Sequence, residues 1–362
     1  MRKIIASIDL GSSTIKIVVA EVLKNKLHVL ASSDTHSKGI KNGLVINETD
    51  VVKSLHEGIK KIEDMLGLKL NKVIVNVPET DAEFCLGEGI TTVTNEEKMV
   101  DGKDIVRALQ ASVYNKVPQT EELVSILPLE FMINEEEVVS DPKKLTANKL
   151  SVKTVIATAP KINVHNIIKC FEKLGIEVID ITFGSIGDYA VFEDEELNQK
   201  IGAIINLGED TTTVSIFNKG IITNTEVISI GGANIDNDIS FIYKITKLDA
   251  RRLKENLALA HRRYADASET EEVCNKLGEN LKINQYEVTE IVMSRLLEIM
   301  NLAKKQINLL TKKEISYIII TGGLTEFTDF SLIIEETFGK NAILGVIKDL
   351  GVRNNKYSTA LG

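Results

Sequence analysis

A sixteen-residue pattern occurs twice in the chain, and this repeat restricts the possible folds more than any other feature. The copies are SIDLGSSTIKIVVAEV (7–22) and IINLGEDTTTVSIFNK (204–219). Both place Asp or Asn, Leu-Gly, two polar residues and Thr between apolar runs. They align without a gap, which pairs Asp9 with Asn206, Gly11 with Gly208, Thr14 with Thr211 and Val19 with Ile216. A duplicated domain is the simplest explanation.

The segments that follow each copy support the interpretation that a whole domain is duplicated. Each copy begins a run of three predicted strands, and helical periodicity follows in both halves. We expect helices at 50–66, 103–115, 162–174, 233–260, 286–310 and near 326–338, and strands at 72–77, 176–182 and 315–321. The polar segment 264–284 reads as a mobile loop. Residues 82–165 read as a small α+β insertion into the first half.

The turn of the first copy has a chemistry that suits an anion. Gly11 would permit a left-handed residue and a close approach to a ligand. Successive turn amides can form an anion-binding nest, to which Ser12, Ser13 and Thr14 add hydroxyl donors. Asp9 would need a partner at the end of a buried strand, and Mg²⁺ bound through water would supply one. Either turn alone could be an ordinary hairpin, but two in register favour a phosphate-binding pair.

Composition excludes several other classes of protein. The formal charge of −9 over 362 residues argues against a nucleic-acid-binding surface. The three cysteines, Cys85, Cys170 and Cys274, are scattered, which predicts neither a disulfide framework nor a zinc site and favours a cytoplasmic setting. No apolar stretch approaches the roughly 18 residues of a membrane span. No GxxxxGK[ST] P-loop occurs.

The two turns resemble the phosphate motifs of the actin/Hsp70/sugar-kinase superfamily. A third element, ITGGLTEF (320–327), resembles its adenosine motif. The resemblance implies an α/β fold: an actin-like (ribonuclease H-like) duplicated two-domain fold with mixed five-stranded sheets.

Within that superfamily the chain is similar, over essentially its whole length, to the FtsA family of bacterial cell-division proteins. The segments GIITNTEVISIGGANIDNDIS (220–240) and LGVRNNKYSTALG (350–362) support this, as does the position of the insertion. The resemblance implies domain 1 (1A) from 1–81 and 166–195, an FtsA-type inserted subdomain (1C) at 82–165, domain 2 (2A) from 196–235 and 301–362, and a helical subdomain (2B) at 236–300.

The same resemblance implies a site for ATP and Mg²⁺. The nucleotide-binding residues would be Gly11, Ser12, Ser13, Thr14, Lys16, Gly208, Thr211, Thr212, Gly231, Gly232, Asn234, Lys254, Glu255, Gly322, Gly323 and Leu324. Asp9 and Asn206 would hold the metal through water. Lys16 could instead be a solvated strand lysine, and Lys254 with Glu255 an ordinary charge pair on a helix.

Three departures from the family pattern bear on activity. Asn206 replaces the usual Asp and brings no charge. Glu209 and Asp210 replace small residues and would repel phosphate unless their side chains turned outward. Phe183 and Gly184 stand where hydrolytic relatives orient water, and the linking segment offers no evident catalytic acid. No catalytic residue is assigned, and we expect nucleotide binding with at most weak ATPase activity.

The resemblance implies a protein that polymerises and tethers FtsZ to the inner face of the cytoplasmic membrane at the septum. The FtsZ tail would bind the helical subdomain, where five basic residues would suit an acidic peptide: Arg251, Arg252, Lys254, Arg262 and Arg263. Other divisome proteins and further copies of the chain would be partners. The sequence ends at Gly362 without the amphipathic C-terminal helix that the family lays on the membrane, so peripheral membrane contact would need such a helix beyond this chain, or another anchor.

Two alternatives remain open at this point. One is the pilus-assembly relative of FtsA, a non-polymerising ATP-binding protein that holds a membrane-protein peptide. The other is a metabolic phosphotransferase of the same fold.

Overall fold

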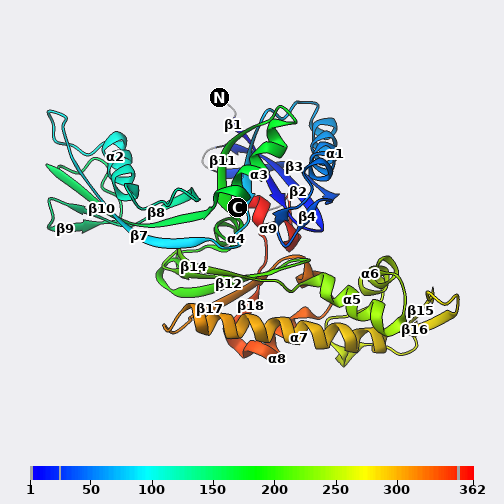
Figure 1. The fold of residues 1–362 in the computed structure, drawn as a ribbon. Coiled ribbons are helices and arrows are strands. Elements are labelled where there is room, and N and C mark those ends of the chain that lie inside the picture. Colours follow the sequence, from blue (N-terminus) through cyan, green and yellow to red (C-terminus); the bar gives the residue numbers. More distant parts are fainter. Residues whose placement is uncertain (1–2, 24–25, 349–350) are drawn as a thin grey trace.

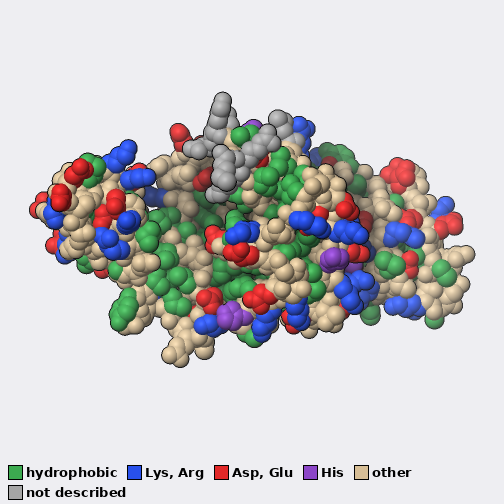
Figure 2. All heavy atoms as spheres, turned by 90° about the horizontal axis from the view of Figure 1, so that it is seen from above, with side chains coloured by type: hydrophobic (Ala, Val, Ile, Leu, Met, Phe, Trp, Pro, Cys, Tyr) green, Lys and Arg blue, Asp and Glu red, His purple; other side chains and the backbone are tan. Residues whose placement is uncertain are grey.

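The computed structural model describes residues 3–23, 26–348 and 351–362. Leu350, the first residue of the segment 350–362 named above, lies outside the described residues. Two parts of similar architecture lie one above the other, and a third part projects from one end of the molecule (Figure 1). Basic and acidic side chains are interspersed on the face seen in Figure 2.

The upper part in Figure 1 is built on a five-stranded sheet in the order β11-β6-β1-β2-β3. Strands β1, β2 and β3 are antiparallel neighbours, whereas β6 and β11 extend the sheet parallel to β1. The strands are β1 (Lys3–Leu10), β2 (Thr14–Leu23), β3 (Lys26–His36), β6 (Lys72–Val77) and β11 (Glu177–Phe183).

The lower part repeats this topology in the order β14-β13-β12-β17-β18. Strands β12, β13 and β14 are again antiparallel, and β17 and β18 again run parallel to β12. Their bounds are β12 (Ile201–Leu207), β13 (Thr212–Asn218), β14 (Ile221–Ile228), β17 (Tyr317–Thr321) and β18 (Ala342–Leu344). The predicted duplication and the two mixed five-stranded sheets are therefore confirmed.

Helices bury an apolar stripe against each sheet. Helix α1 (Glu48–Leu66) begins where the Asn47 side chain accepts a hydrogen bond from the Asp50 amide, and ends at Gly67 with φ 65°. Its stripe of Val51, Leu55, Ile59 and Ile62 joins the first core together with α3 (Lys161–Glu172). Helices α7 (Gln285–Leu310) and α8 (Phe330–Phe338) contribute to the core of the lower part in the same way. A two-stranded hairpin, β4 (Ile40–Lys41) and β5 (Leu44–Val45), precedes α1.

The projecting part has a sheet and a core of its own, as the predicted insertion requires. Its sheet has the order β7-β10-β8-β9, and α2 (Gly102–Val113) packs on it. The strands are β7 (Glu83–Thr92), β8 (Glu121–Ile133), β9 (Glu137–Val139) and β10 (Lys149–Pro160). A Cβ on Gly89 would lie 2.0 Å from the Ala108 carbonyl oxygen, so glycine allows β7 to approach the helix.

The lower part also contains α5 (Gly232–Tyr243), α6 (Lys247–Asn256) and a short hairpin. That hairpin consists of β15 (Thr270–Cys274) and β16 (Asn280–Asn284), so the expected loop at 264–284 is wrong. Val273 and Ile283 are the buried residues of these strands, which explains why the apolar pattern was too weak to detect.

Two short helices connect the upper and lower parts. Helix α4 (Gly184–Phe192) packs against the C-terminal helix α9 (Ser358–Leu361) (Figure 1). The contact is close, because a Cβ on Gly187 would lie 2.7 Å from the Thr359 carbonyl oxygen. Among the residues that the structure describes, no helix has the length and apolarity needed to cross a membrane.

Candidate functional site

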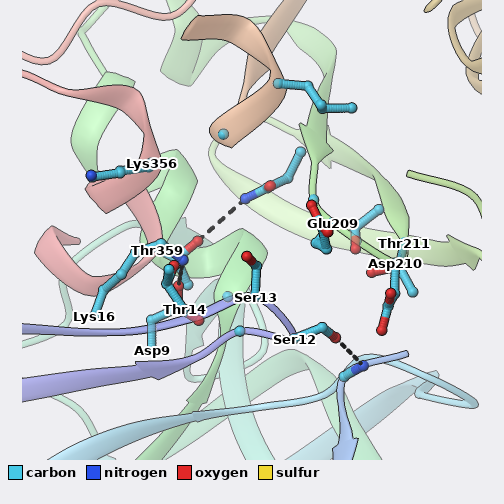
Figure 3. Close-up of a pocket in the computed structure, with 18 of the residues that line it drawn as sticks. Asp9, Ser12, Ser13, Thr14, Lys16, Glu209, Asp210, Thr211, Lys356 and Thr359 are labelled. Atoms are coloured by element: carbon cyan, nitrogen blue, oxygen red, sulfur yellow. Dashed lines mark hydrogen bonds and ion pairs between the residues drawn. The ribbon is translucent and has the colours of Figure 1, made fainter. Parts of the chain in front are cut away.

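A cleft of about 610 Å³ lies between the two sheets. Both repeated turns line it, from opposite sides (Figure 3). The predicted residues that line the cleft are Asp9, Gly11, Ser12, Ser13, Thr14, Lys16, Asn206, Gly208, Thr211, Lys254, Glu255, Gly323 and Leu324. The topology therefore brings most of the predicted site together.

Both turn glycines allow close packing of the backbone. A Cβ on Gly11 would lie 2.7 Å from the Thr14 carbonyl oxygen, and one on Gly208 would lie 2.9 Å from the Thr211 carbonyl oxygen. Neither glycine is among those with positive φ, so the expected left-handed conformation of Gly11 is wrong. Glycine is required here by the tightness of the hairpin, which leaves no room for a side chain.

Asp9 is held by two neighbours at the end of β1. Its carboxylate accepts hydrogen bonds from Lys16 Nζ at 2.8 Å and Asn76 Nδ2 at 2.9 Å, and the residue is 8% exposed. The charge is thus offset within the protein. A carboxylate has about four lone-pair sites, so a metal-bound water can still donate to it. No group of three or more His, Cys, Asp or Glu residues in the described part of the chain is arranged to bind a metal directly.

Asn206 occupies the matching position in the second repeat. Its Nδ2 donates to Asp188 Oδ2 at 2.6 Å and to Thr359 Oγ1 at 3.2 Å. A Cβ on Gly322 would lie 2.6 Å from Asn206 Oδ1, and Gly322 has a φ of 98°. The amide therefore links the lower sheet to both connecting helices, and its role toward a metal stays a prediction.

The two acids of the second turn have partners and do not turn away from the cleft (Figure 3). Glu209 forms an ion pair with Arg251, and Asp210 Oδ2 accepts a hydrogen bond at 3.0 Å from the Asn42 amide of the upper part. Arg251 reduces the expected repulsion of phosphate by Glu209. Asp210 is a direct link across the cleft.

Five predicted residues do not line the cleft: Thr212, Gly231, Gly232, Asn234 and Gly322. Most of them support the second turn from behind. The Gly232 amide donates to the Gly208 carbonyl at 3.0 Å, and Thr212 Oγ1 donates to the Ile230 carbonyl at 2.9 Å. Asn234 Oδ1 accepts from the Gly231 amide at 3.0 Å and caps α5.

Lys254 lies in the wall of the cleft, on α6. It is 5% exposed, pairs with Asp236 at 2.7 Å and donates to the Gly232 carbonyl at 3.3 Å. Burial lowers the pKa of Lys254 and raises the pKa of Asp236. The lysine therefore connects α6 to the glycine pair that supports the second turn.

Two buried acids in the floor of the cleft were missed by sequence reasoning. Glu79 Oε1 accepts hydrogen bonds from Ser185 N at 2.8 Å and Ser185 Oγ at 2.6 Å. Asp188 accepts from Asn206, Ser358 and Thr359. Burial raises the pKa of Glu79 to about 7 and that of Asp188 to about 6. The linking segment thus does place an acid, Asp188, in the cleft floor, which corrects the expectation that it offers none.

The cleft has an excess of acids. Seven carboxyl side chains but three lysines line it. The acids are Asp9, Glu79, Asp188, Glu209, Asp210, Glu255 and Glu326, and the lysines are Lys16, Lys254 and Lys356. An anionic ligand would therefore be bound more favourably together with a divalent cation than alone.

A second hollow lies between α5 and α7. Phe241 and Ile242 on its rim are 85% and 52% exposed. Its charged residues are Asp238, Glu287, Glu290, Glu298 and Arg295, and Arg295 is engaged by Asp238 at 2.6 and 2.8 Å. The hollow is apolar and acidic.

The basic residues expected to attract an acidic peptide are already paired. Arg251 contacts Glu209, Lys254 contacts Asp236, and Arg252 contacts Glu271 at 2.8 Å. Arg262 contacts Glu290 at 2.8 Å, while Arg263 lies over the ring of Tyr264. An acidic ligand is therefore not favoured on this part of the molecule.

Comparison with known proteins identifies two matching family models. One, described as cell division protein FtsA, matches residues 203–362. The other, described as an SHS2 domain inserted in FtsA, matches residues 85–158. Together they cover well over half of the chain.

Individual relatives and structures agree with these matches. Cell division protein FtsA of Bacillus subtilis is 29% identical over 364 residues, covering 98% of this chain and 81% of the relative. The structure of a PilM–PilN type IV pilus biogenesis complex has a TM-score of 0.65 at 12% identity, with 99% and 96% of the two chains covered. MreB5 of Spiroplasma citri bound to ADP has a TM-score of 0.60 at 12% identity, with 99% and 94% covered. At these identities the structures establish the actin-like fold alone.

Proposed function

The chain belongs to the FtsA family of actin-like cell-division proteins, and from this premise we propose that it binds ATP, polymerises and tethers FtsZ to the cytoplasmic membrane at the septum. The observation that supports this most strongly is that the two repeated turns face one cleft. The family match favours this function over the pilus-assembly and phosphotransferase alternatives. The division into 1A, 1C, 2A and 2B at the boundaries given above is part of the proposal.

The phosphates of ATP would lie between the turns at Gly11–Thr14 and Gly208–Thr211. Their amides and hydroxyls would donate to the phosphate oxygens, and Lys16 would add a positive charge. Mg²⁺ would neutralise phosphate charge against the acidic lining, with Asp9 and Asn206 accepting from its waters. The adenosine would lie along Lys254, Glu255, Gly323 and Leu324.

Calorimetric titration of the purified chain with ATP and MgCl₂ tests this assignment. We expect one ATP per chain, a lower affinity without Mg²⁺, and a lower affinity for Ser13→Ala. Ser268→Ala, a remote serine in the loop before β15, is the matched control and should bind ATP as the wild type does. The absence of any ATP binding by the wild type would contradict the proposal.

The FtsZ tail would bind in the hollow between α5 and α7. Exposed Phe241 and Ile242 fit apolar side chains, and the surrounding carboxylates fit basic ones. A peptide with both kinds of residue would therefore bind here more tightly than an acidic one.

Fluorescence anisotropy with a labelled FtsZ tail peptide tests this surface. Phe241→Ser should weaken binding about tenfold or more, because buried aromatic anchors dominate such interfaces. Leu248→Ser, which replaces an apolar residue that is 79% exposed on α6 outside the hollow, is the matched control. Equal losses for the two variants would refute the assignment.

The chain would act at the inner face of the cell membrane, with further divisome proteins as partners. Membrane contact would be peripheral, through a C-terminal amphipathic helix. Electron microscopy of the longest natural form with ATP on a lipid layer should show filaments. Isolated particles that still bind ATP would argue against polymerisation.

A further inference from the structure

Glu79 is an acid held in place at the floor of the cleft. It follows β6 directly after Pro78 and is 8% exposed. Ser185, the second residue of α4, fixes its Oε1 with two hydrogen bonds, one from the amide and one from the hydroxyl. The carboxyl group therefore has a defined position between the first sheet and the connecting helix.

The second carboxyl oxygen of Glu79 has no such partner. Within the described residues, Oε2 accepts no hydrogen bond from protein, and unlike Oε1 it is not sealed off by a partner. It is also not a fully buried atom. Because Glu79 lines the cleft, Oε2 is accessible to a water in the cleft. Burying a carboxyl group costs folding free energy. Stability alone therefore gives no reason to keep a buried carboxyl group whose second oxygen faces the cleft without a protein partner.

The neighbours of Glu79 place it near the proposed phosphate site. Asn76 lies three residues before Glu79. Its side chain donates a hydrogen bond to the Asp9 carboxylate at 2.9 Å and accepts one from the Leu10 amide at 3.0 Å. Gly184 lies against Asn76, because a Cβ on Gly184 would be 3.5 Å from Asn76 Nδ2. Glu79 with Ser185 and Asp9 with the first turn thus share one end of the cleft.

We propose that Glu79 is a catalytic residue for ATP hydrolysis, which accepts the proton of the water that attacks the terminal phosphate. This inference rests on the proposed ATP site. The water oxygen forms a bond to the γ-phosphorus, and the bond from that phosphorus to the β,γ-bridging oxygen breaks. The bond's electron pair stays on ADP, the products are ADP and inorganic phosphate, and the water proton moves to Glu79 Oε2. Ser185 is a positioning residue, since it touches only Oε1.

The ionisation of Glu79 suits this role. Burial and the nearby Asp188 raise its pKa to about 7, and a general base is most effective when its pKa lies near the working pH. The position expected to orient water from the linking segment has Phe183 and Gly184. Glu79 comes from a different strand and reaches the same segment through Ser185.

Glu79→Gln tests the proposal, because the glutamine Oε1 can keep both hydrogen bonds from Ser185 while the base is removed. ATP affinity is measured first, by titration calorimetry, and phosphate release is then measured under saturating ATP and Mg²⁺. We expect a rate loss on the order of 10²-fold with affinity within about threefold of the wild type. Ser185→Ala should lower the rate less and also leave affinity unchanged. Glu83→Gln, an exposed glutamate at the start of β7, is the matched control and should retain the wild-type rate.

The outcomes separate this inference from the proposed function. Wild-type chain that binds ATP without hydrolysing it, or Glu79→Gln that hydrolyses at the wild-type rate, would overturn the inference and leave ATP binding in place. Wild-type chain that binds no ATP would overturn both. If Glu79→Gln fails to fold, Glu79→Ala removes the carboxyl group without leaving a polar side chain in the buried site; a wild-type rate for that variant would also overturn the role.

Discussion

Replacing Glu79 by glutamine should stabilise the protein increasingly as the pH rises. In the folded chain, burial raises the pKa of Glu79 from 4.5 to about 7. The folded state therefore binds more protons than the unfolded state between these pH values. The free energy of unfolding must then fall as the pH rises through this window. Glutamine has no proton to lose, so the variant escapes this part of the loss.

The size of the effect follows from the two pKa values. One pKa unit corresponds to 1.36 kcal/mol, and at pH 5 the unfolded glutamate is already mostly ionised. Glu79 should therefore cost the wild type about 2.5 kcal/mol between pH 5 and pH 8. Asp188, whose pKa is raised from 3.8 to about 6, adds a loss of the same sign. That loss is present in both proteins, so it drops out of the comparison apart from the electrostatic coupling between Asp188 and Glu79.

Urea unfolding of the nucleotide-free chain, followed by circular dichroism at pH 5, 6, 7 and 8, measures the difference between variant and wild type. The difference should grow by about 2.5 kcal/mol over this range. Glu83→Gln, which changes an exposed glutamate, should show no such growth. A Glu79→Gln difference that is the same at pH 5 and pH 8 would refute the buried state of this carboxyl group.

Three further predictions concern the cleft. Lys16→Met should weaken ATP binding by about tenfold or more, measured by titration, because it removes a cation beside the proposed phosphates; unchanged affinity would place the phosphates elsewhere. Glu209→Gln should tighten ATP binding, most clearly at low salt, because it removes a negative charge from the second turn; weaker binding would contradict this. Gly322→Ala should lower the free energy of unfolding in urea by about 1–3 kcal/mol, because φ is 98° and the new Cβ would lie 2.5 Å from the Leu207 carbonyl oxygen; a neutral result would contradict the strain.

The duplicated sheets could be predicted from the sequence because local rules determine them. Each repeat is a hairpin with a short glycine turn and alternating apolar residues, and these signals lie within twenty residues of one another. The helices followed from apolar stripes such as Leu55, Ile59 and Ile62, which the structure buries. The weakly patterned hairpin β15–β16 was missed because its strands are mostly polar.

The floor of the cleft could not be predicted in the same way. Glu79 and Ser185 are far apart in sequence and meet only because β6 and β11 are neighbours in the sheet. Asp188 is reached by Asn206 from one half and by Thr359 from the C-terminal helix. Such contacts depend on the topology of the fold, and neither Glu79 nor Asp188 belongs to a local sequence motif. Because β6 and β11 are parallel neighbours, their carboxyl ends lie at the same edge of the sheet. This rule could have indicated that Glu79, after β6, and Asp188, after β11, lie near one another.

The central claim is that the two repeated turns bind the phosphates of one ATP. A structure of the chain determined with Mg²⁺ and a non-hydrolysable ATP analogue tests it most directly. We predict phosphates in contact with the amides of both the 11–14 and the 208–211 turns, with the metal facing Asp9 through water. An analogue bound outside this cleft, or in contact with neither turn, would contradict the account.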